Sequence, residues 1–370
     1  MSKLFSPLDV GSVKLEHRIA MAPLTRYRAT DDLVPMKDIV KEYYEQRASV
    51  PGTLLITEAT QISPRAIGRS NVPGIWTGEQ VAAWREIVDA IHAKGCFVYL
   101  QLWHLGRGAF ARAAARAGFK VQSASAVPID EDSPVPEAMT EGDIRAVIAD
   151  YAAAARSAVE GAGFDGVEIH AANGYLPDQF LQDVSNRRTD GWGGSVEKRA
   201  RFALEVTKAV VGAVGAERTA IRLSPFSDFQ GMLMDDPHPT FEYLVRELKK
   251  LGRLAYLHLI EARISGNDDA GCGSGNDVGF LVKIWDNTSP VLIAGGIKPD
   301  TARELVDEKY KDYDVVAVFG RYFVSNPDLV FRVKEGVELE KYDRSVFYTP
   351  KLVKGYTDYP FSKEFLARAG

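Results

Sequence analysis

Cysteine is scarce in this chain of 370 residues, which contains only Cys96 and Cys272. Two cysteines so far apart argue against a disulfide framework and against a cysteine-rich zinc or iron–sulfur site. The histidines show no metal-ligand spacing, and the pattern His-Glu-x-x-His does not occur. We therefore expect no metal.

Long apolar runs and basic clusters are also missing. No run is long enough to cross a membrane, and the N-terminus, MSKLFSPLDVG, has no apolar signal segment. The net charge is -5, without a basic cluster that would indicate a nucleic-acid partner. We expect a cytoplasmic protein, monomeric or homodimeric, with a small-molecule substrate and no nucleic-acid or membrane partner.

Short apolar segments of strand length alternate with segments of helical periodicity along most of the chain. The predicted strands are Ile19–Met21, Thr53–Thr57, Phe97–Leu102, Gly166–Ile169, Thr219–Leu223, Ala255–Leu259, Val291–Ala294 and Val315–Phe319. The predicted helices are Val81–Lys94, Glu141–Gly161, Ser195–Val214, Phe241–Leu251 and Thr301–Glu308. This alternation predicts an α/β fold, a single (β/α)8 TIM barrel spanning residues 1–370. No Gly-x-Gly-x-x-Gly follows the first strand, which argues against a Rossmann fold.

Three segments lie outside the alternation. Leu4 to Val13 predicts an N-terminal β-hairpin. Arg107 to Asp132 is the longest irregular segment, and we expect an extended active-site loop there, forming a flap on the substrate side. The tail from Lys341 to Gly370 is too rich in aromatic residues for disorder, so it should fold back onto the barrel.

Glycines follow the seventh and eighth predicted strands, as Gly295-Gly296 and Gly320-Arg321. Barrels often bind phosphate in these two loops, where glycine lets the backbone approach and arginine offers a cationic fork. Glycines that merely turn the chain would explain either loop alone about as well. The two loops together favour a phosphate site.

His170, Asn173 and Tyr175 follow the fourth predicted strand within a few residues. Each alone has an ordinary explanation: a structural histidine, a turn-forming asparagine and a packing tyrosine. Together, at the mouth of a barrel, they indicate a catalytic site. Imidazole and amide can both donate hydrogen bonds to one oxygen, while the phenol can donate a proton to a neighbouring atom.

Other polar side chains sit in or beside otherwise apolar strands. Gln101 and Arg222 are either members of a structural network or, together with the Thr25 hydroxyl, ligands of a planar heterocycle rich in acceptors. Trp103 and Tyr356 either wall a pocket or pack in the core.

Several motifs together resemble the Old Yellow Enzyme family of flavin-dependent ene-reductases, over nearly the whole chain from about Leu4 to Phe361. Two further segments, Val50–Thr57 and Lys354–Phe361, are similar to its filamentous-fungal branch, which includes ergot-alkaloid aldehyde reductases. The family motifs are Met21–Thr25, Leu54–Ala59, Gln101–His104, Gly163–Leu176, Gly191–Ser195, Arg222–Pro225 and Phe319–Arg321.

The resemblance implies FMN bound non-covalently over the barrel mouth, with NADPH or NADH as hydride donor. It places three sets of side chains around the flavin and its substrate. The residues that border the flavin ring would be Pro23, Leu24, Thr25, Ala59, Gln101 and Arg222, those at its phosphate Gly295, Gly296, Gly320 and Arg321, and those at the substrate His170, Asn173, Tyr175, Trp103 and Tyr356.

The implied reaction is reduction of the activated C=C bond of an α,β-unsaturated aldehyde, ketone or nitroalkene. His170 and Asn173 would hold the carbonyl or nitro oxygen, reduced flavin would deliver hydride to the β carbon, and Tyr175 would protonate the α carbon.

Three alternatives stay open. The protein is a reductase or isomerase of one ergot-like secondary metabolite, or a non-catalytic flavin-binding protein, or a flavin-free phosphosugar isomerase or aldolase on the same barrel. The last would need a Schiff-base lysine or a carboxylate base, for which Lys298 and Glu168 are the nearest candidates.

Overall fold

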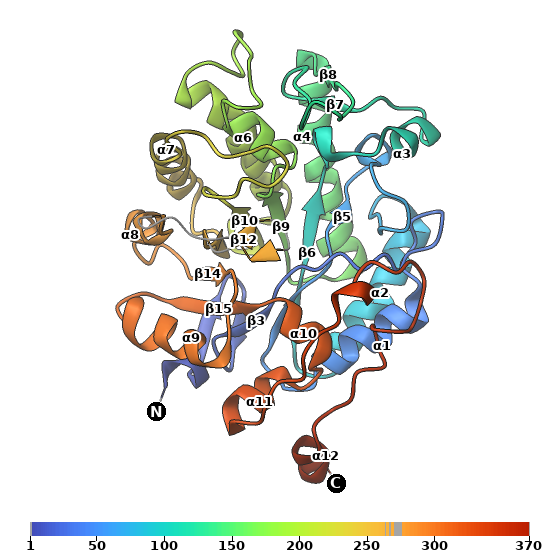
Figure 1. Cartoon of the computed structure of the whole chain (residues 1–370), viewed down its shortest axis with the longest axis vertical. Coiled ribbons are helices and arrows are strands. Elements are labelled where there is room, and N and C mark those ends of the chain that lie inside the picture. The colour runs from blue at the N-terminus through green and yellow to red at the C-terminus, as the bar shows by residue number, and fades with distance from the viewer. Residues whose placement is uncertain (1, 263, 266–267, 270–275, 370) are drawn as a thin grey trace.

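Eight parallel strands close into a barrel in this computed structural model, which describes residues 2–262, 264–265, 268–269 and 276–369 (Figure 1). Each strand pairs in parallel with the next, and β15 pairs with β3 to complete the ring. The barrel strands are β3 (Ile19–Met21), β4 (Leu54–Ile56), β6 (Phe97–Trp103), β9 (Gly166–Ala171), β10 (Thr219–Leu223), β11 (Tyr256–Ile260), β14 (Val291–Ala294) and β15 (Val315–Phe319). The predicted (β/α)8 barrel is confirmed.

Helices surround the barrel, and none of the described helices is long and apolar enough to cross a membrane (Figure 1). They are α1 (Lys37–Arg47), α2 (Gly78–His92), α3 (Ala111–Arg116), α4 (Glu141–Arg156), α5 (Leu176–Leu181), α6 (Val196–Val214), α7 (His238–Leu248), α8 (Gly279–Trp285), α9 (Pro299–Glu304), α10 (Arg321–Ser325), α11 (Leu329–Glu335) and α12 (Lys363–Ala369). The short strands are β1 (Leu8–Val10), β2 (Val13–Leu15), β5 (Thr60–Gln61), β7 (Gln122–Ser123), β8 (Glu137–Ala138), β12 (Ile264–Ser265) and β13 (Asp268–Asp269).

The N-terminal hairpin, formed by β1 and β2, closes the end of the barrel away from the carboxyl ends of the strands. Its Leu8, Val10, Val13 and Leu15 pack in one apolar cluster with inward-facing residues of the strands. At the turn, Gly11 has a positive φ of 57°, and a Cβ there would lie 2.0 Å from the backbone oxygen of Glu217. Only glycine lets the turn approach this closely. The predicted hairpin is confirmed, shifted a few residues toward the C-terminus.

The predicted irregular segment, Arg107 to Asp132, contains regular structure after all, because α3 and β7 lie within it. Arg107 ties it to the neighbouring loop: its guanidinium donates to the carbonyl oxygen of Pro128 at 3.0 Å and to that of Gln230 at 2.9 Å. The segment therefore buttresses the loop after β10.

The tail folds back onto the barrel as predicted and lies against α1 (Figure 1). Buried arginines hold it through its carbonyl groups. Arg26 donates to the oxygen of Gly355 at 2.6 Å, and Arg47 donates to that of Tyr356 at 3.0 Å. Carbonyl acceptors satisfy these buried cations where full counter-ions are lacking.

A buried histidine at the start of β3 makes stability depend on pH. Burial, with the charge of Lys334 adding to it, lowers the pKa of His17 from 6.5 to about 4. Between these values the unfolded chain binds a proton that the folded chain does not, so the free energy of unfolding falls as the pH falls. At pH 5 the loss from His17 should be about 2 kcal/mol relative to pH 7.

Urea unfolding at pH 7 and pH 5 tests this dependence in His17→Asn. An asparagine oxygen can accept the N–H of Ile19 as His17 Nδ1 does at 3.3 Å, so the local turn is retained without a titrating ring. The variant should lose less stability on acidification than the wild type. An equal loss in both proteins would contradict the assignment.

Candidate active site

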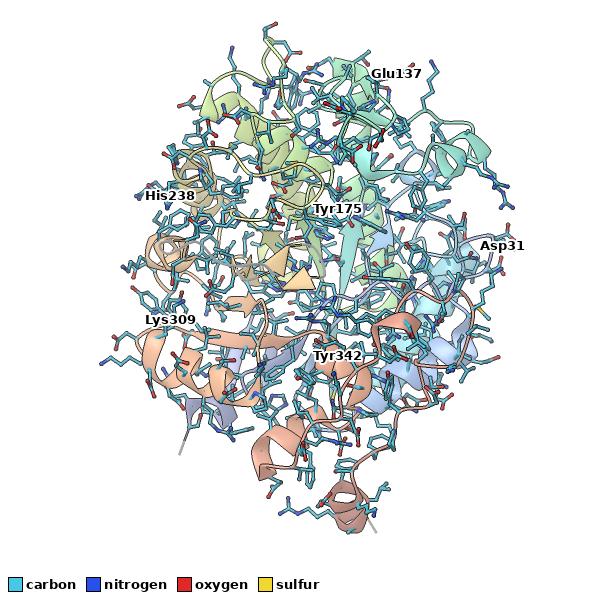
Figure 2. All side chains as sticks on the ribbon, in the orientation of Figure 1. Asp31, Glu137, Tyr175, His238, Lys309 and Tyr342 are labelled. Carbon is cyan, nitrogen blue, oxygen red and sulfur yellow. The ribbon has the colours of Figure 1, made fainter. Side chains whose placement is uncertain are left out.

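One cavity of about 1070 Å³ opens at the carboxyl ends of the barrel strands. Figure 2 shows Tyr175 near the centre of the view and Tyr342 below it, and both residues line this cavity. Every predicted site residue except Tyr356 lines it as well: Pro23, Leu24, Thr25, Ala59, Gln101, Trp103, His170, Asn173, Tyr175, Arg222, Gly295, Gly296, Gly320 and Arg321. The fold thus collects side chains from loops far apart in the sequence.

The turn after β9 is held rigidly. Asn173 has a positive φ of 56°, a conformation that asparagine tolerates better than most residues. Its N–H donates to Ser224 Oγ at 2.7 Å, and its carbonyl oxygen accepts from Gln230 Nε2 at 2.6 Å. The next N–H, of Gly174, donates to the buried Asp178 carboxylate at 2.9 Å. These bonds fix the directions in which the Asn173 and Tyr175 side chains leave the backbone.

His170 and Asn173 each present an unsatisfied polar atom. His170 Nδ1 and Asn173 Oδ1 are buried and have no hydrogen-bond partner among the described residues. Burial lowers the pKa of His170 well below its ordinary value, and electrostatic interaction with Arg222 and His258 adds to this effect. The imidazole is therefore neutral at pH 7. Buried polar atoms without partners are costly, so they mark a place where a ligand completes the hydrogen bonding.

Tyr175 lies between two other rings. Its ring centroid is 5.0 Å from that of Trp103 and 4.7 Å from that of His170, both edge to face. Burial raises the pKa of the Tyr175 hydroxyl, and the charge of Arg69 opposes that rise only in part. The phenol consequently keeps its proton across the physiological range, as a proton donor must.

Gln101 lines the cavity and also belongs to a structural network of hydrogen bonds. Its amide donates to Glu168 Oε1 at 2.7 Å, while Glu168 Oε2 lies 2.7 Å from His258 Nδ1. Burial alone would raise the pKa of Glu168, but His258, Arg222 and Gln101 outweigh it and hold the pKa below its usual value. Glu168 is fully buried with both oxygens engaged, so it is no base for a sugar-phosphate substrate.

The loops after β14 and β15 suit a phosphate group. Gly295 and Gly296 have positive φ values of 123° and 62°, and a Cβ on Gly295 would lie 2.9 Å from the Cβ of Glu261. The guanidinium of Arg321 lies over the Tyr342 ring, 5.3 Å from its centroid. Lys298 lines the cavity beside them. This cradle of close backbone and basic side chains fits an anion.

The charges around the whole cavity have one sign. Its described lining contains basic residues and no aspartate or glutamate. The basic residues are Arg26, Arg69, Arg222, Lys298 and Arg321. A cavity of this size and charge fits a large anionic cofactor together with a small substrate.

Tyr356 was predicted to shape the substrate pocket, and that prediction is wrong. Its side chain is fully buried away from the cavity and stacks on Tyr43 with ring centroids 4.0 Å apart and planes 3° from parallel. Arg26 and Arg28 lie over its ring at 5.1 and 4.7 Å. Its role is to anchor the tail.

Two substitutions of Tyr356 test this role. The Tyr356 hydroxyl has no hydrogen-bond partner among the described residues, so Tyr356→Phe should change the free energy of unfolding by less than about 1 kcal/mol. Tyr356→Ala removes a buried ring and should cost about 3–5 kcal/mol. Urea unfolding measures both. Destabilisation of equal size in the two variants would show that the hydroxyl, and not the stacked ring, is what matters.

Six aromatic residues absent from the prediction also line the cavity, Tyr322 and Tyr342 among them. Of the other four, Tyr27 lies in the loop after β3, Phe229 lies in the loop after β10, and Phe347 and Tyr348 belong to the tail. Tyr27 and Tyr348 meet edge to face with ring centroids 5.9 Å apart. The aromatic content of the tail was the one signal available for the last two. No described residue between Trp103 and His170 lines the cavity, so the predicted substrate-side flap supports neighbouring loops of the cavity without lining it.

Comparison with known protein families matches residues 3–340 to the family described as "NADH:flavin oxidoreductase / NADH oxidase family". The chain belongs to this family. It is an NAD(P)H-dependent flavin oxidoreductase of Old Yellow Enzyme type, and the cofactor of the flavin oxidoreductase family to which it belongs is FMN. The glycine cradle and the basic lining both fit that cofactor.

Two relatives and one solved structure place this flavin oxidoreductase more closely. It is 58% identical to the chanoclavine-I aldehyde reductase fgaOx3 of Penicillium roqueforti, over 99% of this chain and 98% of the relative. It is 49% identical to a "Probable inactive dehydrogenase easA" of Claviceps fusiformis, over 99% and 96%. The Old Yellow Enzyme from Pichia sp. AKU4542 superposes with a TM-score of 0.90 at 38% identity, covering 98% of this chain and 94% of that one.

Proposed function

We propose that this protein is an NAD(P)H-dependent ene-reductase that reduces the activated C=C bond of α,β-unsaturated aldehydes, ketones or nitroalkenes. One observation carries the proposal: unsatisfied polar atoms of His170 and Asn173 lie beside the protonated Tyr175 phenol in the same cavity. A carbonyl or nitro oxygen would accept hydrogen bonds from the His170 imidazole and, once the Asn173 amide is turned to present its N–H, from that amide. The conjugated carbon would then lie within reach of the Tyr175 phenol.

The site residues divide the work. When bound, FMN supplies the hydride that the β carbon accepts. The neutral imidazole of His170 and the amide of Asn173, turned to present its N–H, donate hydrogen bonds to the substrate oxygen. These bonds withdraw electrons from the double bond and stabilise the negative charge that develops on the oxygen. Tyr175 delivers its proton to the α carbon.

Other cavity residues would hold the flavin. The side chains of Thr25, Gln101 and Arg222 would border its ring, with Pro23, Leu24 and Ala59 packing beside them. The permanent charge of Arg222 favours a negatively charged ring edge. Gly295, Gly296, Gly320 and Arg321 would hold the phosphate. Trp103, next to Tyr175, would shape the substrate pocket.

The test is spectroscopic and then kinetic. Purified protein should show flavin absorbance, NADPH should bleach it without oxygen, and a simple enal such as cinnamaldehyde should restore it. Protein that stays colourless after FMN is added would overturn the proposal. Bleaching by NADPH without reoxidation by any enal, enone or nitroalkene would instead favour a flavin protein without this activity, as the name of the Claviceps relative describes for that protein.

The physiological substrate is a second, narrower proposal. Similarity to a chanoclavine-I aldehyde reductase over nearly the full length of both chains favours an ergot-like aldehyde, which the protein would reduce or isomerise. The exposed aromatic rings at the cavity mouth, Phe229 and Tyr348, suit a polycyclic molecule. Incubation with such an aldehyde and mass analysis of the product separates reduction, which adds two hydrogens, from isomerisation, which adds none.

A further inference from the structure

Among the basic residues of the described cavity lining, Arg69 is the one that neither the flavin site nor the tail uses. It follows β5, which pairs with β6, whereas the phosphate cradle follows β14 and β15. Arg222 lies deep at the end of β10, and Arg26 is bound to tail carbonyl groups. Arg69 is only half-buried, at the mouth.

The backbone around Arg69 is held in place by hydrogen bonds and close packing. The buried side chain of Gln61 accepts the N–H groups of Gly68 and Arg69 at 2.7 and 3.2 Å, and its amide donates to the Arg69 oxygen at 3.3 Å. The N–H of Phe110 donates to the oxygen of Gly68 at 2.9 Å. A Cβ on Gly68 would lie 2.6 Å from that of Ala109, so the two loops are packed as closely as glycine allows.

The guanidinium of Arg69 lies on the face of the Phe110 ring, 3.6 Å from its centroid. In the part of the chain that the structure describes, it has no carboxylate or carbonyl partner. A guanidinium stacked on a ring keeps its N–H donors pointing outward in its own plane, where they can grip an anion with two hydrogen bonds. The stacking sets the orientation of the fork before any ligand arrives.

Exposed aromatic side chains share the cavity region with this charge. Phe110, Phe229 and Tyr348 are 56%, 38% and 51% exposed, and the last two line the cavity with Arg69. Arg69 also lies close enough to Tyr175 to influence its pKa. A ligand that reaches the Tyr175 phenol therefore enters a cavity whose aromatic lining carries the unpaired positive charge of Arg69.

We infer that Arg69, stacked on Phe110, is a second ligand subsite that binds an anionic group, carboxylate or phosphate, on a molecule entering the cavity. The inference rests on the proposed ene-reductase function and deepens it. Two sources offer this chemistry: a carboxylate on an aromatic enal substrate, and the extra phosphate that distinguishes NADPH from NADH. A substrate carboxylate predicts faster turnover of a carboxylated enal than of the uncharged enal, and the extra phosphate predicts tighter binding of NADPH than of NADH. Both preferences should weaken as salt screens the half-buried charge of Arg69.

Matched probes separate the two sources. One arm compares kcat/KM for 4-carboxycinnamaldehyde with that for cinnamaldehyde. The other compares the Kd of unreactive tetrahydroNADP with that of tetrahydroNAD, read from the change in flavin absorbance. In Arg69→Gln, the preference for the anionic member should fall roughly tenfold in at least one arm. Arg69→Lys keeps the charge without the fork and should fall between wild type and Arg69→Gln.

Arg112→Gln is the matched control, since Arg112 is an exposed arginine of α3, two residues from Phe110 and outside the cavity lining. It removes the same charge and should leave both preferences as in the wild type. Wild-type turnover of cinnamaldehyde tests the proposed function separately. If that turnover is present while Arg69→Gln keeps both preferences, the subsite is refuted. An equal loss of preference for the anionic ligands in Arg69→Gln and Arg112→Gln would also refute the subsite. Such a result would mean that the net positive charge of this region, and not a specific contact with Arg69, sets the preference.

Discussion

Tyr175→Phe is expected to slow the reoxidation of the reduced enzyme by a simple enone by about 10²–10⁴-fold. The substitution keeps the ring that packs against Trp103 and His170 and removes only the hydroxyl. Because burial raises the pKa of that hydroxyl, the wild-type residue holds its proton throughout the neutral range and is always ready to donate it. Without the donor, the α carbon must take its proton from water.

The same variant should leave the reduction of the flavin by NADPH nearly as fast as in the wild type, because that half of the reaction requires no proton on carbon. Stopped-flow absorbance follows the two halves separately. Tyr27→Phe removes a phenol elsewhere in the same cavity and should have a much smaller effect on both. If Tyr175→Phe slows neither half, or slows both alike, Tyr175 is not the acid.

The barrel was predictable because its strands are buried on both faces. Segments such as Val291–Ala294 and Val315–Phe319 are short, fully apolar and bounded by turn residues, and they appear in the structure with the predicted bounds. Helix α1 escaped prediction because its sequence, KDIVKEYYEQR, mixes charge with aromatic residues and has only a weak apolar stripe. The helix is stabilised instead by tertiary packing of its buried Tyr43 and Tyr44 side chains.

The site was predictable where side chains follow directly from a strand. The ends of β9 and β10 carry His170 and Arg222 to one mouth, because their residues stand side by side in the sheet register. The tail offered no such rule. It has no strand or long helix to fix which ring faces inward, so Tyr356 was chosen and Tyr348 was missed. Buried arginines bind the carbonyl groups of Phe347, Leu352 and Gly355. In the backbone path that these bonds hold, Tyr348 lines the cavity and Tyr356 does not.

Removing either hydrogen-bond donor to the substrate oxygen is expected to lower kcat by about 10²–10³-fold. His170→Phe keeps an aromatic ring against Tyr175. Asn173→Gly suits the positive φ of 56° at that position, so the turn need not distort. The two donors act on one oxygen, so the double variant should lose much less than the product of the single losses. Because the pKa of His170 lies well below its ordinary value, the loss in His170→Phe should be the same at pH 6 and pH 8.

A backbone control accompanies the second variant. Asn287 is exposed, far from the cavity, and also has a positive φ, of 51°. If Asn287→Gly keeps wild-type kinetics while Asn173→Gly does not, the effect belongs to the amide side chain and not to glycine in the chain. Fully multiplicative losses in the double variant would mean that the two side chains act at different steps or on different atoms. That result would contradict the proposal that His170 and Asn173 donate hydrogen bonds to the same substrate oxygen and thereby withdraw electrons from the double bond.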